Sequence, residues 1–314
     1  MEDQAHLGCN EVWGGNSAAN ASLTLPGVRG WVYSDPYLDA DAGGDVYYVS
    51  SCGTGRITRV MLADVMGHGA QAAEVGRYLR GLMRRYLNHI EPHTLARQVN
   101  ELFNARSDDA GRFATAVILT FFAPTGEVTL CNAGHPAPLM RHGRDGRWAA
   151  MHRAAGNAEP SNLPLGVIES GDYTAFDATL DPDDAILLYT DGLIEATDPS
   201  GTQLGVQRLI DLLNHMDGPG PAPQPGHIAH ALPETLEAQG YTLSGDDLSL
   251  VLLHCTERST GAGFRRTLGG MKAALTDLVR GREIAWPEPS VRNIGGALFK
   301  PLNHVGQSRQ DREG

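Results

Sequence analysis

The sequence lacks the features of secreted and membrane proteins. Its cysteines are few and far apart and form no Cys-x-x-Cys pair, so we expect neither a disulfide framework nor a zinc site; they are Cys9, Cys52, Cys131 and Cys255. No apolar run approaches the ~20 residues needed to span a bilayer. The N-terminus has neither the basic patch nor the apolar stretch of a signal peptide. These absences predict a cytoplasmic protein that does not bind membranes.

Positive charge is also scarce. The 314 residues include 25 Lys and Arg against 37 Asp and Glu, which gives a formal net charge of -12. Because nucleic-acid binders normally present a basic face, no nucleic-acid partner is expected. The sequence has no P-loop, His-Glu-x-x-His or Gly-x-Ser-x-Gly pattern either. The familiar nucleotide-binding, zinc-protease and serine-hydrolase motifs therefore do not explain its chemistry.

The hydrophobic pattern divides the chain into three parts. Residues 1–29 are polar and aperiodic, which predicts an extended leader with at most one edge strand. Residues 257–314 form a C-terminal tail whose stretch 264–280 has the spacing of an amphipathic helix. Between them, runs of strand-like sequence are interrupted by two pairs of helices, over about 70–90 and 93–105 and over 204–213 and 227–239. This order predicts an α+β domain with mainly antiparallel sheets rather than a doubly wound one.

Four aspartates stand where predicted strands meet loops: Asp45, Asp64, Asp191 and Asp246. A single such aspartate is usually only a turn former. However, Asp45 begins one strand and Asp64 ends its predicted hairpin partner, so the two should lie at the same end of the hairpin. Hard cations such as Mg²⁺ and Mn²⁺ prefer oxygen ligands. A site holding two such ions, which can activate a water for in-line attack on phosphorus, is therefore the functional alternative to four unrelated turns.

Six motifs occur in an order that resembles the metal-dependent (PPM-type) Ser/Thr protein phosphatases, and the bacterial sporulation and stress-response branch in particular. The motifs are Gly43-Gly44-Asp45, Asp64-Val65-Met66-Gly67-His68-Gly69, Asn132-Ala133-Gly134-His135-Pro136, Leu163-Pro164-Leu165-Gly166, Tyr189-Thr190-Asp191-Gly192 and Gly245-Asp246-Asp247-Leu248-Ser249. The resemblance covers residues 30–256. It implies a four-layer α-β-β-α sandwich of two mainly antiparallel sheets flanked by helices, with two Mn²⁺ or Mg²⁺ ions between the sheets.

The resemblance also implies roles for individual residues. Asp64 would bridge both ions, and the backbone carbonyl of Val65 would bind the second. Asp191 and Asp246 would hold the first ion, and Asp45 would orient metal-bound water or reach an ion through it. The last metal-site candidate is Asp247, whose position is filled by a neutral residue in much of the family.

Two positions depart from the family pattern. Eukaryotic members have a histidine general acid two residues after the bridging aspartate, where this chain has Met66. His68 is displaced by two residues, so we expect it to shape the turn or cap the following helix. The phosphate-binding arginine of those members has no clear equivalent, and Arg29 is a candidate by sequence position alone.

The leading hypothesis is a phosphoprotein phosphatase that hydrolyses phosphoserine or phosphothreonine by direct attack of metal-bound water. The branch implies a phosphorylated regulatory protein as substrate, for example an anti-anti-sigma-like factor in a partner-switching pathway. Two alternatives stay open. One is a pseudophosphatase that binds a phosphoprotein without turnover, and the other is a hydrolase of small phosphate esters, which lack remote groups for binding.

Overall fold

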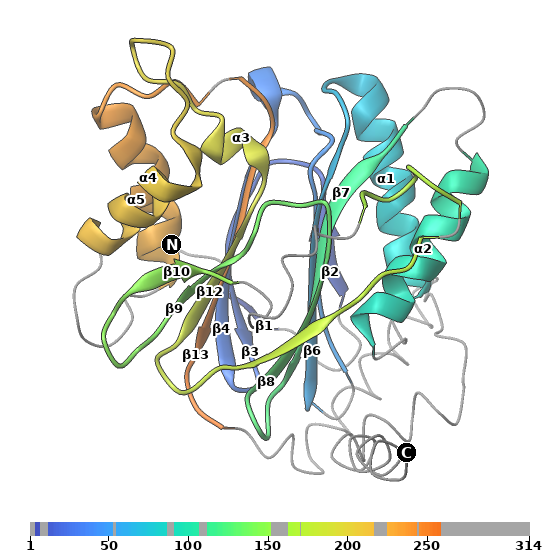
Figure 1. Cartoon of the computed structure of the whole chain (residues 1–314), viewed down its shortest axis with the longest axis horizontal. Coiled ribbons are helices and arrows are strands. Elements are labelled where there is room, and N and C mark those ends of the chain that lie inside the picture. Colours follow the sequence, from blue (N-terminus) through green and yellow to red (C-terminus); the bar gives the residue numbers. More distant parts are fainter. Residues whose placement is uncertain are drawn as a thin grey trace, which may run out of the picture.

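The computed structural model describes residues 4–6, 12–52, 55–86, 91–106, 112–151, 163–169, 171–216, 225–243 and 245–258. Two β-sheets lie face to face, and helices cover the outer face of each sheet (Figure 1). The predicted α+β class with an α-β-β-α sandwich is confirmed. The predicted tail helix at 264–280 lies outside the described residues, as does nearly all of the tail.

The first sheet has seven strands, and all its neighbouring pairs are antiparallel except β1 with β3. Its long central strands β4 and β13 pair from Asp35 opposite Leu248 to Val28 opposite Cys255. In spatial order the strands are β1 (Gln4–His6), β3 (Ala19–Leu25), β4 (Val28–Asp35), β13 (Leu248–Cys255), β12 (Ala185–Tyr189), β9 (Leu139–Arg141) and β10 (Trp148–Ala150).

The second sheet has six strands, all in antiparallel pairs. Its centre is the pair β6 and β7, which stays in register from Ile57 opposite Phe122 to Val65 opposite Ala114. In spatial order the strands are β11 (Phe176–Thr179), β8 (Glu127–Ala133), β7 (Ala114–Phe122), β6 (Ile57–Val65), β5 (Val46–Ser51) and β2 (Val12–Gly15).

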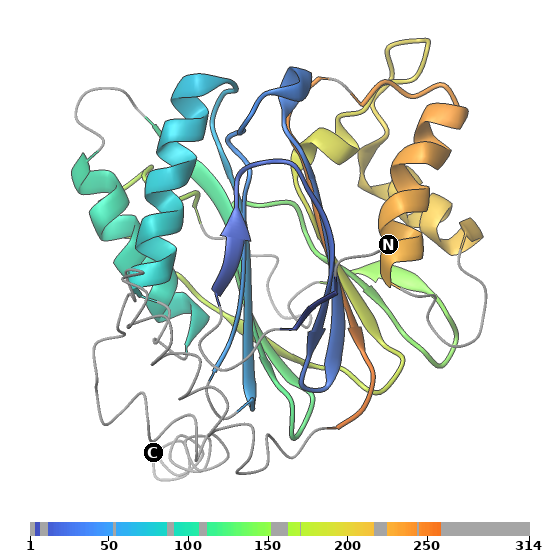
Figure 2. The same cartoon turned by 180° about the vertical axis from the view of Figure 1, so that it is seen from behind.

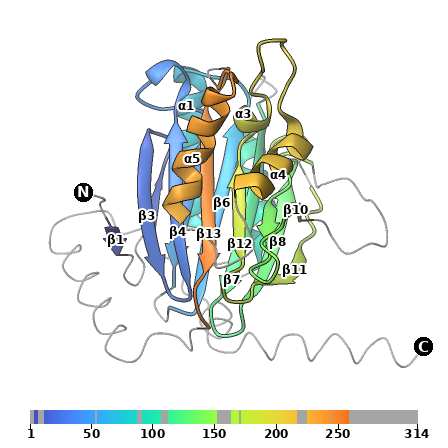
Figure 3. The same ribbon diagram turned by 90° about the vertical axis from the view of Figure 1, so that its left-hand side faces the viewer.

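Three apolar layers hold the sandwich together. Because successive strand residues point to opposite faces, β6 sends Val60 and Leu62 into the core between the sheets and Met61 and Ala63 toward the helices. Helices α1 (Ala70–Arg85) and α2 (Pro92–Arg106) cover the six-stranded sheet, while α4 (Gly205–Met216) and α5 (Pro225–Ala238) cover the seven-stranded sheet (Figure 2, Figure 3). The short elements η1 (Tyr37–Asp39) and α3 (Asp191–Ile194) lie in loops that follow β4 and β12.

The prediction for the N-terminal residues 1–29 is wrong. Residues 1–29 were expected to carry at most one edge strand, but β2 joins the six-stranded sheet beside β5, and β3 joins the seven-stranded sheet beside β4. Strand β2 has only four residues, Val-Trp-Gly-Gly, and β3 consists mostly of small and polar residues, so neither gave a clear periodic signal. The sheets therefore begin well before residue 30. Separately, none of the helices that the structure describes is long and apolar enough to cross a bilayer.

Candidate metal centre

Asp45 and Asp64 lie side by side at one end of the six-stranded sheet. Strand β5 starts at Val46, β6 ends at Val65, and Val46 pairs with Ala63, so the antiparallel register places Asp45 opposite Asp64. Residues 60 and 62 of β6 face the other sheet, and by alternation Asp64 faces the same way. The predicted hairpin is confirmed, and it directs both carboxylates toward the space between the sheets.

The seven-stranded sheet brings its aspartates to the same end of the sandwich. Strand β12 ends at Tyr189, which pairs with Leu250 of β13. Asp191 therefore follows one strand just where Asp246 and Asp247 precede the other. All five carboxylates of the sequence prediction come from strand ends at this end of the molecule.

A hydrogen bond joins the two sheets at this point. The Thr190 hydroxyl donates to a carboxylate oxygen of Asp45 at 2.8 Å and accepts a hydrogen bond from the backbone N–H of Ser249 at 2.9 Å. Both Asp45 and Thr190 are buried. Thr190 thus fixes the orientation of the Asp45 carboxylate. The sequence reasoning missed this role, although Thr190 stands beside Asp191 in one of the quoted motifs.

Asp247 holds a loop rather than facing an open space. Its two carboxylate oxygens accept backbone N–H hydrogen bonds from Tyr37 and Gly44, each 2.6 Å long. A β-carbon at Gly43 would collide with the same carboxylate, so the loop can close around Asp247 only with glycine there. Since both oxygens already have partners, Asp247 is a weaker candidate for a metal ligand than Asp246.

Burial and mutual repulsion raise the pKa values of this cluster. The pKa of Asp64 is raised to about 9 by burial and then by Asp45, Asp191, Asp246 and Asp247. Burial raises the pKa of Asp45 well above its ordinary value, which the hydrogen bonds of Thr190 and Ser249 only partly oppose. Burial and neighbouring acidic groups likewise raise the pKa of Asp191 and of Asp246. Among the described residues, none of the ion pairs involves these carboxylates.

Comparison with known proteins decides which family this arrangement represents. The family model for stage II sporulation protein E (SpoIIE) matches residues 54–256, which is more than half of the chain. The chain belongs to the SpoIIE family. The resemblance to PPM-type phosphatases is thereby confirmed.

Two relatives of this SpoIIE-family domain come from Bacillus subtilis (strain 168). Phosphoserine phosphatase RsbP is 29% identical over 206 residues, which cover 63% of this chain and 47% of RsbP. Phosphoserine phosphatase RsbU is 25% identical over 205 residues, which cover 62% of this chain and 58% of RsbU. The chain thus spans about half the length of these relatives.

Solved structures support the fold of the SpoIIE-family domain. The RsbU and RsbW domains of Rv1364c from Mycobacterium tuberculosis match with a TM-score of 0.59 and 23% identity, over 78% of this chain and 64% of that chain. The catalytic domain of the serine/threonine protein phosphatase PstP, solved with two manganese ions, matches with a TM-score of 0.51 and 19% identity, over 73% of this chain and 99% of that chain.

The donor set of the SpoIIE-family domain fits hard divalent cations. Carboxylate oxygens are the preferred ligands of Mg²⁺ and Mn²⁺, and a cluster whose members raise one another's pKa gains most from a bound positive charge. Within the described residues, no three His, Cys, Asp or Glu side chains already lie in a ligand arrangement around one point.

The Val65 carbonyl has a matching backbone environment. A β-carbon at Gly44 would lie 2.9 Å from the Val65 carbonyl oxygen and 3.2 Å from the Ala72 side chain. Glycine at position 44 therefore leaves room for this carbonyl beside the carboxylates. This packing agrees with the predicted ligand role of Val65, which stays a prediction.

The structure separates the remaining candidates. Arg29 is the backbone strand partner of His254, at the end of β4 that lies away from Asp35 and the carboxylates. Its predicted role in phosphate binding is therefore wrong. The N-cap residue of α1 is Gly69 rather than His68, and no side-chain cap hydrogen bond is made there. The exposed ring of His68 instead lies 4.7 Å from that of Tyr37, measured between ring centroids.

A partly buried threonine lies opposite Asp64 on the neighbouring strand and is bonded to a buried histidine. Thr115 is the antiparallel partner of Asp64, and its hydroxyl is hydrogen-bonded to Nδ1 of His135 at 2.8 Å. The Asn132 side chain bonds both the backbone N–H and the carbonyl of His135, which forms the tight turn after β8. Burial lowers the pKa of His135 to about 3, so the ring is neutral and contributes no charge to the site.

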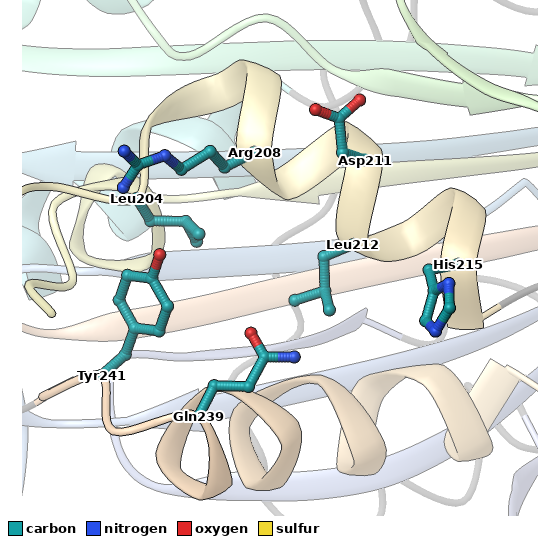
Figure 4. Close-up of a pocket in the computed structure, with 7 residues that line it drawn as sticks. All are labelled: Leu204, Arg208, Asp211, Leu212, His215, Gln239 and Tyr241. Atoms are coloured by element: carbon teal, nitrogen blue, oxygen red, sulfur yellow. The ribbon is translucent and has the colours of Figure 1, made fainter.

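A cavity lined by described residues lies elsewhere. It has a volume of about 410 Å³ and lies between α4 and the segment after α5, on the outer side of the seven-stranded sheet (Figure 4). Its lining residues are Leu204, Arg208, Asp211, Leu212, His215, Gln239 and Tyr241. None of the five carboxylates contributes to it, so this cavity is not the metal centre.

Proposed function

We propose that this SpoIIE-family domain is a Mn²⁺- or Mg²⁺-dependent phosphatase that removes phosphate from serine or threonine of a regulatory protein. The carboxylate cluster at the meeting point of the two sheets carries this proposal, because its charges repel one another until a cation binds. The names of RsbP and RsbU support phosphoserine as the substrate group. A partner-switching regulator, for example an anti-anti-sigma-like factor, is the proposed substrate protein.

The proposed roles follow the placement of each residue. When bound, two divalent ions supply an activated water and neutralise charge on the phosphate. Asp64 would contact both ions, Asp191 and Asp246 would hold one, and the Val65 carbonyl would bind the other. Asp45, fixed by Thr190, would orient water at the centre, and Asp247 would keep the surrounding loop in place.

Proton transfer to the leaving serine oxygen does not use a histidine at the family position. Met66 stands there, with 47% of its surface exposed, and a thioether has no proton to give. In this proposal the leaving oxygen takes its proton from water. The protein contributes orientation and charge rather than a general acid.

The test is hydrolysis of a phosphoserine peptide with and without added Mn²⁺. We expect activity that requires the metal and falls on the order of a hundredfold or more in Asp64→Asn and Asp191→Asn. Asp145→Asn is the matched control, because Asp145 is exposed and outside the cluster. Full activity in Asp64→Asn, or in the presence of a chelator, would contradict the proposal.

Two further results would select the other functions considered above. Tight binding of the phosphopeptide with no turnover at any metal concentration would identify a pseudophosphatase. Equal efficiency on the phosphopeptide and on an aryl phosphate would identify a hydrolase of small esters, because the peptide's remote groups would then contribute nothing to catalysis.

A further inference from the structure

Large apolar side chains are exposed at the end of the sandwich that carries the carboxylates. Among the described residues they are Leu38 at 75% exposure, Leu163 at 49%, Met66 at 47%, Val167 at 46% and Ile168 at 42%. Exposed hydrophobic residues scattered over a surface need no explanation, but a group of them in one place commonly marks an interaction site.

Backbone contacts place two of the three segments side by side. The N–H of Met66 donates to the carbonyl of Phe113 at 3.1 Å, directly after Asp64 and Val65. Ala114, which follows Phe113 and begins β7, exchanges two backbone hydrogen bonds with Leu165, at 2.9 and 2.8 Å. The segment 163–168 therefore lies one strand away from Met66, next to the metal centre.

The segment 166–169 is held in place by a buried side chain. Asn100 of α2 is fully buried; its Oδ1 accepts from the N–H of Gly166 at 2.8 Å, and its Nδ2 donates to the carbonyls of Ile168 and Glu169 at 2.9 and 3.2 Å. These three hydrogen bonds hold the backbone of the segment against α2, while the side chains of Val167 and Ile168 are exposed to solvent. The exposed apolar groups are thus presented on a fixed backbone.

Leu38 is presented from the other side of the metal centre. It has a positive φ of 54°, a conformation that costs a leucine energy and that occurs most often at functional sites. Its turn is anchored by the hydrogen bond from the Tyr37 N–H to Asp247 and by the contact between the Tyr37 and His68 rings. The turn that exposes Leu38 is therefore built onto the carboxylate cluster itself.

We propose that Leu38, Met66, Val167 and Ile168 form an apolar rim that binds a phosphoserine-containing protein segment with large apolar side chains beside the phosphoserine. This inference rests on the proposed function. The occupant is apolar rather than acidic because the chain carries a net charge of -12 and the centre itself holds five carboxylates, which disfavour acidic flanking residues. The backbone contacts place the rim near the centre from two directions, so a segment that places its phosphate there can contact it.

The experiment compares two synthetic phosphoserine peptides, one with leucine and valine beside the phosphoserine and one with serine at those positions. Hydrolysis by the Mn²⁺-loaded full chain gives the ratio of their kcat/KM values. We expect a preference of roughly tenfold for the apolar peptide, falling toward one in the double variants Leu38→Ser/Met66→Ser and Val167→Ser/Ile168→Ser. Ala149→Ser, at an exposed position on β10, should keep the preference.

Binding of the same peptides, measured by fluorescence anisotropy, separates this inference from the proposed function. If neither peptide is hydrolysed, the proposed function fails, yet tighter binding of the apolar peptide that the rim variants abolish still supports the rim. An equal affinity for both peptides overturns the proposal that the rim binds apolar flanking residues. Urea unfolding checks that each variant folds. Self-association of the wild type that is lost in the rim variants would assign the rim to a second copy of the chain and overturn the proposal.

Discussion

The Thr190 hydroxyl lies 2.8 Å from the Asp45 carboxylate, and this hydrogen bond joins the end of one sheet to the start of a strand in the other. Both groups are buried, so neither can exchange its partner for bulk water. A buried acceptor that loses its donor bears the full cost of desolvation. The stability of the sandwich and the geometry of the proposed metal centre therefore depend on the same contact.

We expect Thr190→Val to lower the free energy of unfolding by about 1–3 kcal/mol, because the isosteric side chain removes one donor to Asp45 and the acceptor of the Ser249 N–H. Thr190→Ser should restore most of the loss. Urea denaturation measures the change. Thr179→Val, at an exposed position on β11, is the control and should stay within about 0.5 kcal/mol of wild type. An equally small effect at Thr190 would contradict the assigned role.

Asp64 should destabilise the metal-free protein at neutral pH. Its pKa is raised in the folded state from 3.8 to about 9. The protonated form is therefore the one that folding favours. The stability that the protonated carboxyl contributes to the folded state is fully present below pH ~4 and is lost as the pH rises toward ~9. In chelator at pH 8, Asp64→Asn should be more stable than wild type, by on the order of 2 kcal/mol.

Urea unfolding at pH 4 and pH 8 tests this expectation. The advantage of Asp64→Asn should shrink strongly at pH 4, where the wild-type carboxylate is protonated in the folded state and close to half protonated in the unfolded state. Saturating Mn²⁺ should reverse the order at pH 8, because the cation stabilises the wild type by binding only its folded state. A variant that is less stable than wild type at both pH values in chelator would disprove the argument.

Metal binding should release protons. Since Asp45 and Asp64 have raised pKa values, carboxyl protons must leave before Mn²⁺ can bind. Calorimetric titration at pH 7 in two buffers of different ionisation enthalpy should show the release of about one proton or more. Asp64→Asn should release fewer. Heats that are identical in both buffers would show that the cluster is already ionised.

Asp246 and Asp247 should respond differently to the same substitution. Asp247→Asn can no longer accept two backbone hydrogen bonds, so we expect a loss of about 1–3 kcal/mol in unfolding free energy without metal. Asp246→Asn removes a carboxylate with a raised pKa, so it should leave metal-free stability unchanged or higher while weakening Mn²⁺ affinity. Chelator-treated unfolding and Mn²⁺ titration of both variants test the distinction. The reverse pattern would make Asp247 the ligand.

The local parts of the site were accessible from sequence. Asp45 and Asp64 are joined by one short hairpin, so turn residues and strand alternation were enough to predict that they meet. The helix α1 after Asp64 was equally plain from its three- and four-residue apolar spacing. These predictions succeeded because the interactions that decide them lie within about 20 residues of chain.

The predictions that failed concern features decided by contacts between distant parts of the chain. Strands β2 and β3 were missed because β2 is very short, β3 is mostly small and polar, and both take part in the sheets through pairing with β5 and β4. Arg29 was placed near the phosphate by its position in the sequence, whereas the register of β4 against β13 puts it at the far end. His135 stands in one of the quoted motifs, but its hydrogen bond to Thr115, the strand partner of Asp64, depends on the tertiary arrangement of the strands and could not be predicted from the motif.

The sequence by itself determined the secondary structure of the core, the family motifs and the oxygen-rich character of the centre, because residue type and spacing set local conformation and ligand chemistry. Only the tertiary structure decided that Thr190 orients Asp45, that Asp247 closes a loop and that Leu38 stands exposed in the turn anchored to Asp247. Each depends on the register between strands far apart in the chain, and such pairing is fixed by packing of the whole sandwich rather than by any local preference.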